Sequence, residues 1–283
     1  MNPLEKPIVH WFKENRRDLP WRSTSPWGVM VSEYMLQQTP VNRVLPVWVE
    51  WMDRWPTPVD LAKATPAQVI TAWGRLGYPR RALRLHAAAQ IIAEDFNNEV
   101  PEDIYTLRQL PGIGEYTAAA ISAFAFQKRT LVVDINIRRL LTRVIDGNEH
   151  PKPAPTTRER TARFTLLPEK DAHVWAAATM ELGAIVCTSQ NPKCELCPVI
   201  AACKWRLLGY PKTELIRKSQ SWHGTDRKCR GTIVQALREN NSLTESAIKK
   251  LWPDESQVEK ALVTLLEDQL IQSISRSRYR LPQ

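Results

Sequence analysis

Apolar residues recur at helical spacing along most of the chain, from residue 3 to about residue 208. Val174, Ala177, Ala178, Leu182 and Ile185, for example, fall on one face of a helix. Pro and Gly separate these short segments, and no run of alternating apolar and polar residues is long enough for a sheet. The pattern therefore predicts an all-α region.

Two polar stretches break the helical pattern. Residues 147–157 (GNEHPKPAPTT) predict a long loop, and residues 209–225 (GYPKTELIRKSQSWHGT) predict a linker. The remaining residues predict three helices and then two short strands, near 227–239, 244–252, 254–269, 270–274 and 278–281. This order is typical of a small winged-helix unit.

Composition and charge fit a globular protein with a polyanionic partner. Hydrophobic residues make up 43% of the chain, which excludes general disorder, and the length of 283 residues predicts one large domain or two to three small ones. The chain shows no apolar signal segment and no stretch near the roughly 18 apolar residues of a membrane span. We therefore expect a soluble, unsecreted protein that does not bind membranes. The net charge of +9 suits nucleic acid but is common among soluble proteins.

Four of the five cysteines lie in one short segment, Cys187-x6-Cys194-x2-Cys197-x5-Cys203. This spacing predicts a metal cluster in a reducing compartment rather than a disulfide framework. Zinc sites with four cysteines usually have two close pairs, whereas this segment has one, so a [4Fe–4S] cluster fits better. The fifth, Cys229, is interpreted as an inert small hydrophobic residue.

A glycine-rich turn stands between two helical stretches at residues 110–118, LPGIGEYTA. Gly112 and Gly114 allow a tight turn that presents backbone N–H groups at the start of a helix, where they attract a phosphate. This helix-hairpin-helix pattern holds a DNA backbone without reading its sequence. On its own, the pattern is equally compatible with a helix–helix turn that merely requires glycine.

Two carboxylates are candidates for glycosidic chemistry. Glu33 lies in VSEYMLQQT, and Asp134 follows an apolar run in LVVDINIRR. Cleavage of a glycosidic bond needs a proton donor and a carboxylate near the developing positive charge. Asp134 is equally suited to cap a helix, and Glu33 could be a solvated charge on one.

Several segments, taken in order, resemble the MutY family of adenine DNA glycosylases in the helix-hairpin-helix superfamily. They are LPWR (19–22), SEYMLQQT (32–39), LGYPRRALRLH (76–86), LPGIGEYTA (110–118), VVDINIRR (132–139), MELGAIVC (180–187) and the four-cysteine loop. The resemblance covers about residues 7–210. It implies a bacterial-type protein of the cytoplasm that associates with the nucleoid and acts as a monomer.

The resemblance implies an all-α catalytic region and a small α+β winged-helix-like C-terminal unit. A six-helix barrel with the hairpin would occupy residues 25–135, and an iron–sulfur cluster module would combine residues 1–24 and 136–210. A linker would follow at 211–225, and the winged-helix-like domain would span 226–283.

The implied reaction removes adenine mispaired with 8-oxoguanine or guanine in double-stranded DNA. The adenine must first be flipped out of the duplex. By resemblance, Glu33 is the general acid that protonates adenine, and Asp134 stabilises or transiently traps the sugar cation. Tyr116 and Asn136 would orient and polarise groups around Asp134.

Further residues would bind the DNA. By resemblance, Gln38 and Tyr78 insert into the gap left by the flipped base, with Thr39 and Leu76 near the orphaned guanine. The alternative for Leu76 and Tyr78 is core packing. Arg22 would contact adenine or a phosphate, and Lys193 would add a phosphate contact unless it is simply solvated.

The sequence departs from the family at three places. Pro79 stands where many members have a second tyrosine, and Ala177 stands where many carry Gln or Glu close to the adenine. Members usually add a large β-rich C-terminal domain that helps to recognise 8-oxoguanine. After residue 225 this chain has room only for the small winged-helix unit.

Three alternatives compete with adenine removal. A thymine-mismatch glycosylase shares the hairpin and the cluster, but Gln37-Gln38-Thr39 favours adenine. An endonuclease III type has a lysine at the position of Tyr116, and this chain lacks that amine. A non-enzymatic iron–sulfur DNA-binding regulator is disfavoured by Glu33 and Asp134.

Overall fold

The protein is described by a computed structural model that covers residues 2–213 and 224–283. Its contacts divide the chain into two units. The first unit contains Met1–Val29, Glu102–Gln109 and Ile113–Ile216, and the second contains Met30–Pro101, Leu110–Gly112 and Arg217–Gln283. None of the described helices is long and apolar enough to cross a bilayer.

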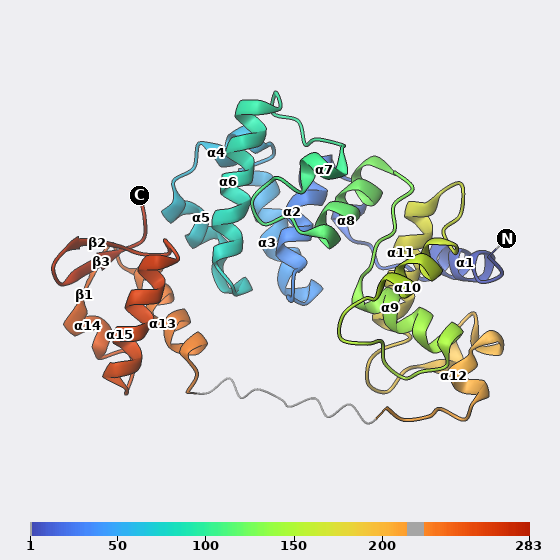
Figure 1. The fold of residues 1–283 in the computed structure, drawn as a ribbon. Helices are drawn as coiled ribbons and strands as arrows, with labels where there is room; N and C mark the ends of the chain where they lie inside the picture. The colour runs from blue at the N-terminus through green and yellow to red at the C-terminus, as the bar shows by residue number, and fades with distance from the viewer. Residues whose placement is uncertain (1, 214–223) are drawn as a thin grey trace. The chain divides into compact units, whose positions relative to one another are not determined.

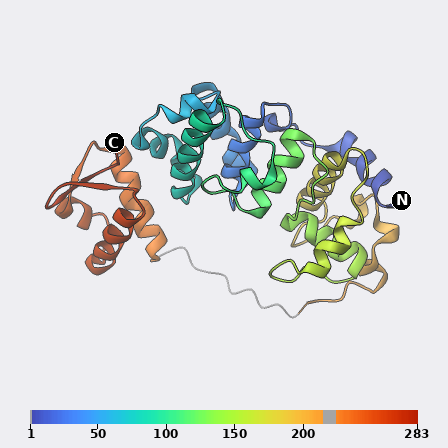
Figure 2. The ribbon, with the colours of Figure 1, turned by 45° about the horizontal axis from the view of Figure 1, so that its top comes forward.

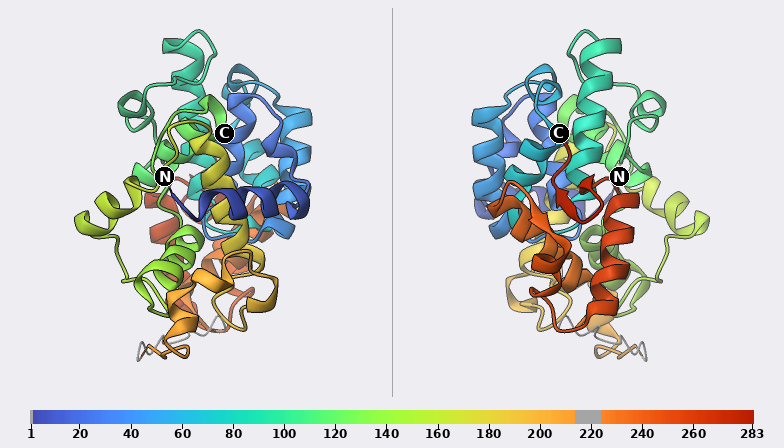
Figure 3. Two further views of the ribbon diagram at one scale, coloured as in Figure 1. Left: turned by 90° about the vertical axis from the view of Figure 1, so that its right-hand side faces the viewer. Right: turned by 90° about the vertical axis from the view of Figure 1, so that its left-hand side faces the viewer.

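All regular elements in the described residues of the first unit are helices (Figure 1). Its elements are α1 (Glu5–Asn15), η1 (Pro20–Arg22), α7 (Ile104–Leu107), α8 (Glu115–Phe126), α9 (Ile135–Leu141), the π-helical η3 (Thr142–Asp146), α10 (Thr157–Phe164), α11 (Ala172–Ile185), η4 (Cys194–Leu196), η5 (Ile200–Ala202) and α12 (Lys204–Leu207). Helix α11 packs against α1, α8 and α9, and Figure 3 shows α1 crossing α11 in the left view. The core of this unit therefore forms around α11.

The second unit begins within α2 (Pro26–Leu36), which continues from the first. It continues with α3 (Val41–Arg54), α4 (Pro58–Ala62), α5 (Pro66–Trp73), η2 (Gly74–Leu76) and α6 (Arg80–Asp95). Helix α5 starts at a capping box in which Thr65 and Gln68 satisfy each other's backbone N–H groups. On α6, Leu85, Ala88 and Ile92 are fully buried because their spacing places them on one face.

The C-terminal part of the second unit combines three helices with a small sheet (Figure 2). Its elements are α13 (Asp226–Glu239), β1 (Leu243–Thr244), α14 (Glu245–Lys249), α15 (Glu255–Glu267), β2 (Gln272–Ser275) and β3 (Arg278–Arg280). The strand order is β1-β3-β2, and both pairings are antiparallel. Strand β3 places Tyr279 opposite Leu243 and Ser273.

The predicted fold class is confirmed: the regular elements of residues 2–213 are all helices, and the strands of the described chain occur only near the C-terminus. The sequence pattern did not predict β1, because two residues are too few to show an alternation. Most of the predicted linker lies outside the described residues. The predicted boundaries of the barrel and the cluster module stay a prediction.

Candidate active site and cysteine cluster

Asp134 is the N-cap of α9. Its Oδ1 accepts hydrogen bonds from the backbone N–H groups of Asn136 at 2.6 Å and Ile137 at 3.3 Å. The second oxygen, Oδ2, takes no part in this cap, and the side chain is half-buried. Asp134 thus fulfils the capping role while the helix N-terminus favours its negative charge. The carboxylate is held in one orientation and keeps an oxygen for another partner.

A buried arginine connects the start of α9 to the first cysteine of the loop. Arg139 donates from Nη2 to the Asn136 side-chain oxygen at 2.9 Å and to the Gly183 carbonyl at 2.6 Å, and from Nε to the Cys187 carbonyl at 2.8 Å. Asn136 therefore contacts Asp134 through its backbone N–H group, while its side chain is held by Arg139. A Cβ atom on Gly183 would lie 2.5 Å from the Asn136 carbonyl oxygen, so α11 and α9 approach closely because this residue is glycine.

Of the two glycines in the turn before α8, only the first has the left-handed backbone conformation that favours glycine. Gly112 has φ +86°, and a Cβ atom there would lie 2.8 Å from the Tyr34 ring and 3.0 Å from Cβ of Arg84. Gly114 caps α8 with an ordinary φ of −89°. Tyr116, on the first turn of α8, is half-buried against the core of the first unit.

Glu33 and the two predicted insertion residues lie in the second unit. Glu33 is on α2 and is only 7% exposed, so its carboxyl group is shielded from solvent. Gln38 and Tyr78 are exposed, and both have left-handed backbone conformations, with φ 55° and φ 49°. Positive φ is uncommon for such side chains and concentrates at functional positions.

Arg81 joins the two segments that carry these insertion residues. It is 7% exposed, and burial lowers the pKa of its guanidinium to about 10. The guanidinium donates to carbonyls of both segments and to one hydroxyl: Tyr34 (2.9 Å), Met35 (3.1 Å), Gln37, Leu76 (3.4 Å), Gly77 (2.9 Å) and Thr39 Oγ1 (3.0 Å).

The sequence analysis missed Arg81, although a signal was present. Arg81 lies on the same face of α6 as the buried residues Leu85, Ala88 and Ile92. This spacing alone indicates that the Arg81 cation is buried, which is rare for an arginine. Thr39 and Leu76, predicted near the orphaned guanine, are 7% and 3% exposed, and the Thr39 hydroxyl lies 3.1 Å from the Leu76 carbonyl. Both residues therefore support, from inside the unit, the segments that carry Gln38 and Tyr78.

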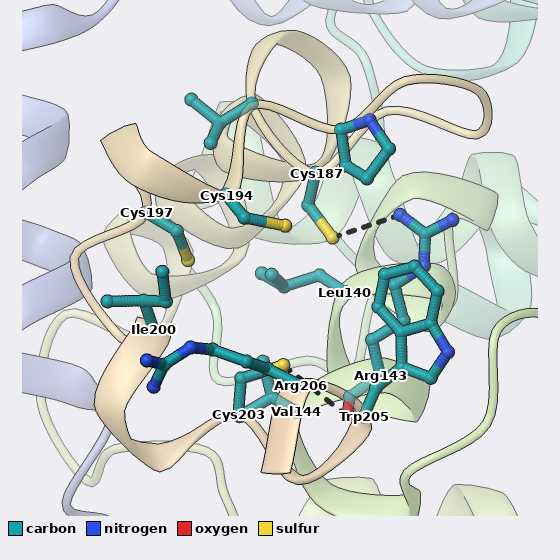
Figure 4. Close-up of a pocket in the computed structure, with 12 residues that line it drawn as sticks. Leu140, Arg143, Val144, Cys187, Cys194, Cys197, Ile200, Cys203, Trp205 and Arg206 are labelled. Carbon is teal, nitrogen blue, oxygen red and sulfur yellow. Dashed lines mark hydrogen bonds between the residues drawn. The ribbon is translucent and has the colours of Figure 1, made fainter. Parts of the chain in front are cut away.

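Four cysteines line one small cavity in the first unit (Figure 4). They are the predicted cluster ligands Cys187, Cys194, Cys197 and Cys203. Within the described ranges, no three Cys, His, Asp or Glu side chains converge as the ligands of one metal ion do. A [4Fe–4S] cluster binds each of four thiolates at a different iron, and the four cysteines around this one cavity supply that set of ligands.

Arg143 supports the cysteine cavity from η3. It is 1% exposed, donates from Nη1 to Cys187 Sγ at 3.4 Å and to the Thr188 carbonyl at 2.7 Å, and lies over the Trp205 ring at 4.5 Å. Burial raises the pKa of Cys197 to about 12, so thiolates here need a positive partner. The four cysteine thiols, the residues that line the cavity and the adjacent Arg143 cation all fit an iron–sulfur cluster.

Two other predicted DNA-binding residues have different surroundings. Arg22 donates to the Arg17 carbonyl and, at 2.9 Å, to Glu181 Oε2, and its guanidinium lies over the Phe12 ring at 5.1 Å. Lys193 is exposed in the loop between the first two cysteines. A DNA contact by either residue stays a prediction.

Comparison with known proteins identifies the family. A model described as "HhH-GPD superfamily base excision DNA repair protein" matches residues 31–165. The chain is 44% identical to the adenine DNA glycosylase of Mycolicibacterium smegmatis over 99% of this chain and 96% of that protein. It is also 44% identical to the adenine DNA glycosylase of Mycobacterium tuberculosis, over 97% and 92%. The human adenine DNA glycosylase is 39% identical over 70% of this chain and 38% of that protein.

Solved structures share the fold. A thermostable thymine-DNA glycosylase superposes with a TM-score of 0.66 at 26% identity, covering 72% of this chain and 94% of that one. Endonuclease III in a non-covalent DNA complex gives 0.63 at 19% identity, covering 73% and 95%, which shows the fold alone. The family model and the relatives at 44% identity together define a base excision DNA glycosylase of the helix-hairpin-helix class. Because relatives at 44% identity span nearly the whole chain, it belongs to the adenine DNA glycosylases.

Proposed function

We propose that this protein excises adenine mispaired with 8-oxoguanine or guanine in double-stranded DNA and leaves an abasic site. The observation that carries the proposal is the Asp134 carboxylate, fixed at the start of α9 through one oxygen while the other is uncommitted. An oriented carboxylate of this kind suits stabilisation of positive charge on a sugar.

Chain residues account for each step of the hydrolysis. Glu33, shielded on α2, donates a proton to a ring nitrogen of the flipped adenine, which lets the bond between the base and the sugar break. Asp134 stabilises the oxocarbenium charge that develops on the sugar. Water then adds to that sugar carbon and gives its proton to the Glu33 carboxylate, which restores the acid and yields the abasic site and free adenine.

DNA binding is proposed to rest on backbone contacts and on insertion. The backbone N–H groups of the turn at Gly112 and Gly114 would bind a phosphate, and exposed Lys193 would add a second contact. Gln38 and Tyr78, presented by strained backbone, would fill the space left by the adenine. We further propose that the protein works as a monomer on the nucleoid DNA of the cytoplasm.

Base release from four duplexes tests the activity. We expect rapid release from A:8-oxoG and A:G, and none from T:G or A:T. Asp134→Asn and Glu33→Gln should abolish release while binding is largely kept, because the phosphate contacts remain. Release of thymine from T:G by the wild type, or near-native turnover by either variant, would contradict the proposal.

We also propose that Cys187, Cys194, Cys197 and Cys203 hold a [4Fe–4S] cluster. When bound, the cluster would order the loop that carries Lys193 and would take no part in chemistry on the base. Cys197→Ser should reduce the broad visible absorbance and the iron content and weaken DNA binding, whereas Cys229→Ser should keep all three. Stoichiometric zinc without iron in anaerobically purified protein would contradict the cluster.

A further inference from the structure

The C-terminal part of the second unit is packed against α5 and α6 of the same unit. Ile70 on α5 is fully buried in the hydrophobic core of α13 and α15. Arg238 on α13 donates from Nε to the Ile70 carbonyl at 3.1 Å, and burial lowers the pKa of Arg238 to about 10. Asp268 pairs with Arg80 of α6 at 3.1 Å and with Arg230 of α13.

These contacts bring the start of α13 to the segment that precedes α6. The guanidinium of Arg227 lies 5.0 Å from the ring centroid of Tyr78, whose side chain is 43% exposed. Arg227 is itself exposed, and no carboxylate of the described chain is within ion-pair distance of it. The neighbouring Asp226 accepts a hydrogen bond from Gln257 at 2.6 Å.

We propose that Arg227 is a DNA-binding residue that contacts a backbone phosphate beside the base step into which Tyr78 inserts. The inference rests on the proposed function, since it takes Tyr78 as the inserted side chain. A guanidinium stacked on a ring keeps its N–H groups at the edge, where they can bind a phosphate with two hydrogen bonds.

The fixed position of Arg227 makes this contact effective. Docking through Ile70, Arg238 and Asp268 orders the start of α13 before DNA binds, so less conformational freedom is lost on binding. On β3, by contrast, Arg278 already donates to Ser242 Oγ at 3.0 Å. The proposed C-terminal DNA contact therefore lies on α13.

The test measures binding rather than base release. Arg227→Ala, Arg227→Lys and wild type are compared by fluorescence anisotropy, over a salt series, on duplexes with a stable abasic-site analogue opposite guanine or 8-oxoguanine. We expect Arg227→Ala to bind both duplexes about tenfold more weakly, with the slope of log K against log salt smaller by about one. Arg227→Lys should keep the slope and recover part of the affinity.

Arg54→Ala is the matched control. Arg54 is also exposed and stacked on an aromatic ring, that of Trp55 at 4.5 Å, so the variant removes the same charge and the same kind of contact from α3. We expect its affinity and salt slope to equal those of the wild type. Asp268→Ala, which loosens the packing of α13, should also weaken DNA binding. The double variant Asp268→Ala/Arg227→Ala should lose less binding free energy than the sum of the losses in the two single variants.

Each outcome separates the inference from the proposed function. Unchanged affinity and salt slope in Arg227→Ala, together with adenine release by the wild type, would overturn the inference alone. A loss with only one of the two opposite bases would indicate a base contact and would also overturn the phosphate assignment. Wild-type protein that releases no adenine would contradict the proposed function, whatever the anisotropy of Arg227→Ala shows.

Discussion

The guanidinium of Arg81 donates a 3.0 Å hydrogen bond to the hydroxyl of Thr39, and so joins the segment after α2 to the segment before α6. The same group donates to the Gly77 carbonyl at 2.9 Å, next to Tyr78. The spacing between Gln38 and Tyr78, the two exposed residues predicted to insert into the DNA, is therefore set by one buried cation.

Replacing Arg81 by Lys should slow adenine release more than it weakens DNA binding. An ammonium has three donors on one atom and cannot reach both segments as the planar guanidinium does. We expect single-turnover release to fall about 10- to 100-fold, roughly 1.4 to 2.7 kcal/mol of barrier. Reduced fluorescence of 2-aminopurine at the flipped position would locate the defect in base flipping. The idea fails if Arg81→Lys matches an Arg54→Lys control in both measurements.

Gly183→Ala should impair the site although Gly183 is not itself a proposed catalytic residue. The added methyl group would meet the Asn136 carbonyl oxygen at 2.5 Å, so α9 must shift and carry Asp134 with it. We expect base release to drop at least tenfold with a modest fall in Tm, because reacting groups tolerate little displacement. Gly231→Ala, where nothing lies within 4 Å, is the control on another helix. Native turnover in Gly183→Ala would show that α9 tolerates the shift.

Features formed by residues close together in the sequence could be predicted from it, whereas features formed by distant residues could not. The four cysteines, the Asp134 cap and the Gly112 turn are local patterns, and the structure places each where its spacing indicates. Arg81 and Arg139 act on residues 42 and 44 positions away, and such pairing has no signature in a single sequence. Docking of Ile70 into the C-terminal core is equally invisible, since Ile70 fits the apolar face of α5.

Glu181 forms a similar long-range network with Arg17 and Arg22, and this network makes the stability of the protein depend on pH. It is 2% exposed; burial acts to raise its pKa, but hydrogen bonds from Arg17 and the charge of Arg22 outweigh burial and lower it. A lowered folded-state pKa contributes stability above the unfolded value of about 4.3, and that stability is lost as pH falls through the folded value.

Glu181→Gln should therefore destabilise the protein by about 2 to 4 kcal/mol near neutral pH, since it leaves two arginines unpaired. The difference from wild type should shrink as pH falls from the unfolded value of about 4.3 through the lower folded-state pKa of Glu181. Thermal unfolding at pH 7 and at a series of acidic pH values below about 4.3 measures both quantities. A difference that stays constant over the whole series would exclude the ionised pair as its source.

Deleting the residues after 225 should cost stability as well as DNA affinity. Ile70, fully buried in the complete chain, would be exposed together with its neighbours Ala67 and Leu83. We expect a lower Tm and self-association in size-exclusion chromatography. Adding Ile70→Gln to the truncated chain should restore a monomer, because it removes the exposed apolar side chain. A truncated chain that is monomeric with an unchanged Tm would contradict the packing of α13 on α5.

Tyr116 occupies the position where lyase-type relatives are expected to carry a lysine nucleophile. Its phenol can donate a hydrogen bond but cannot form an imine with the deoxyribose aldehyde. We expect the wild type to leave intact abasic sites. Tyr116→Lys should gain strand cleavage by β-elimination and become trappable on DNA by borohydride, because an amine then lies on the first turn of α8. Tyr116→Phe, which removes only the hydroxyl, should show neither activity. Strong borohydride trapping of the wild type, abolished by replacing some other lysine, would show that a different nucleophile operates.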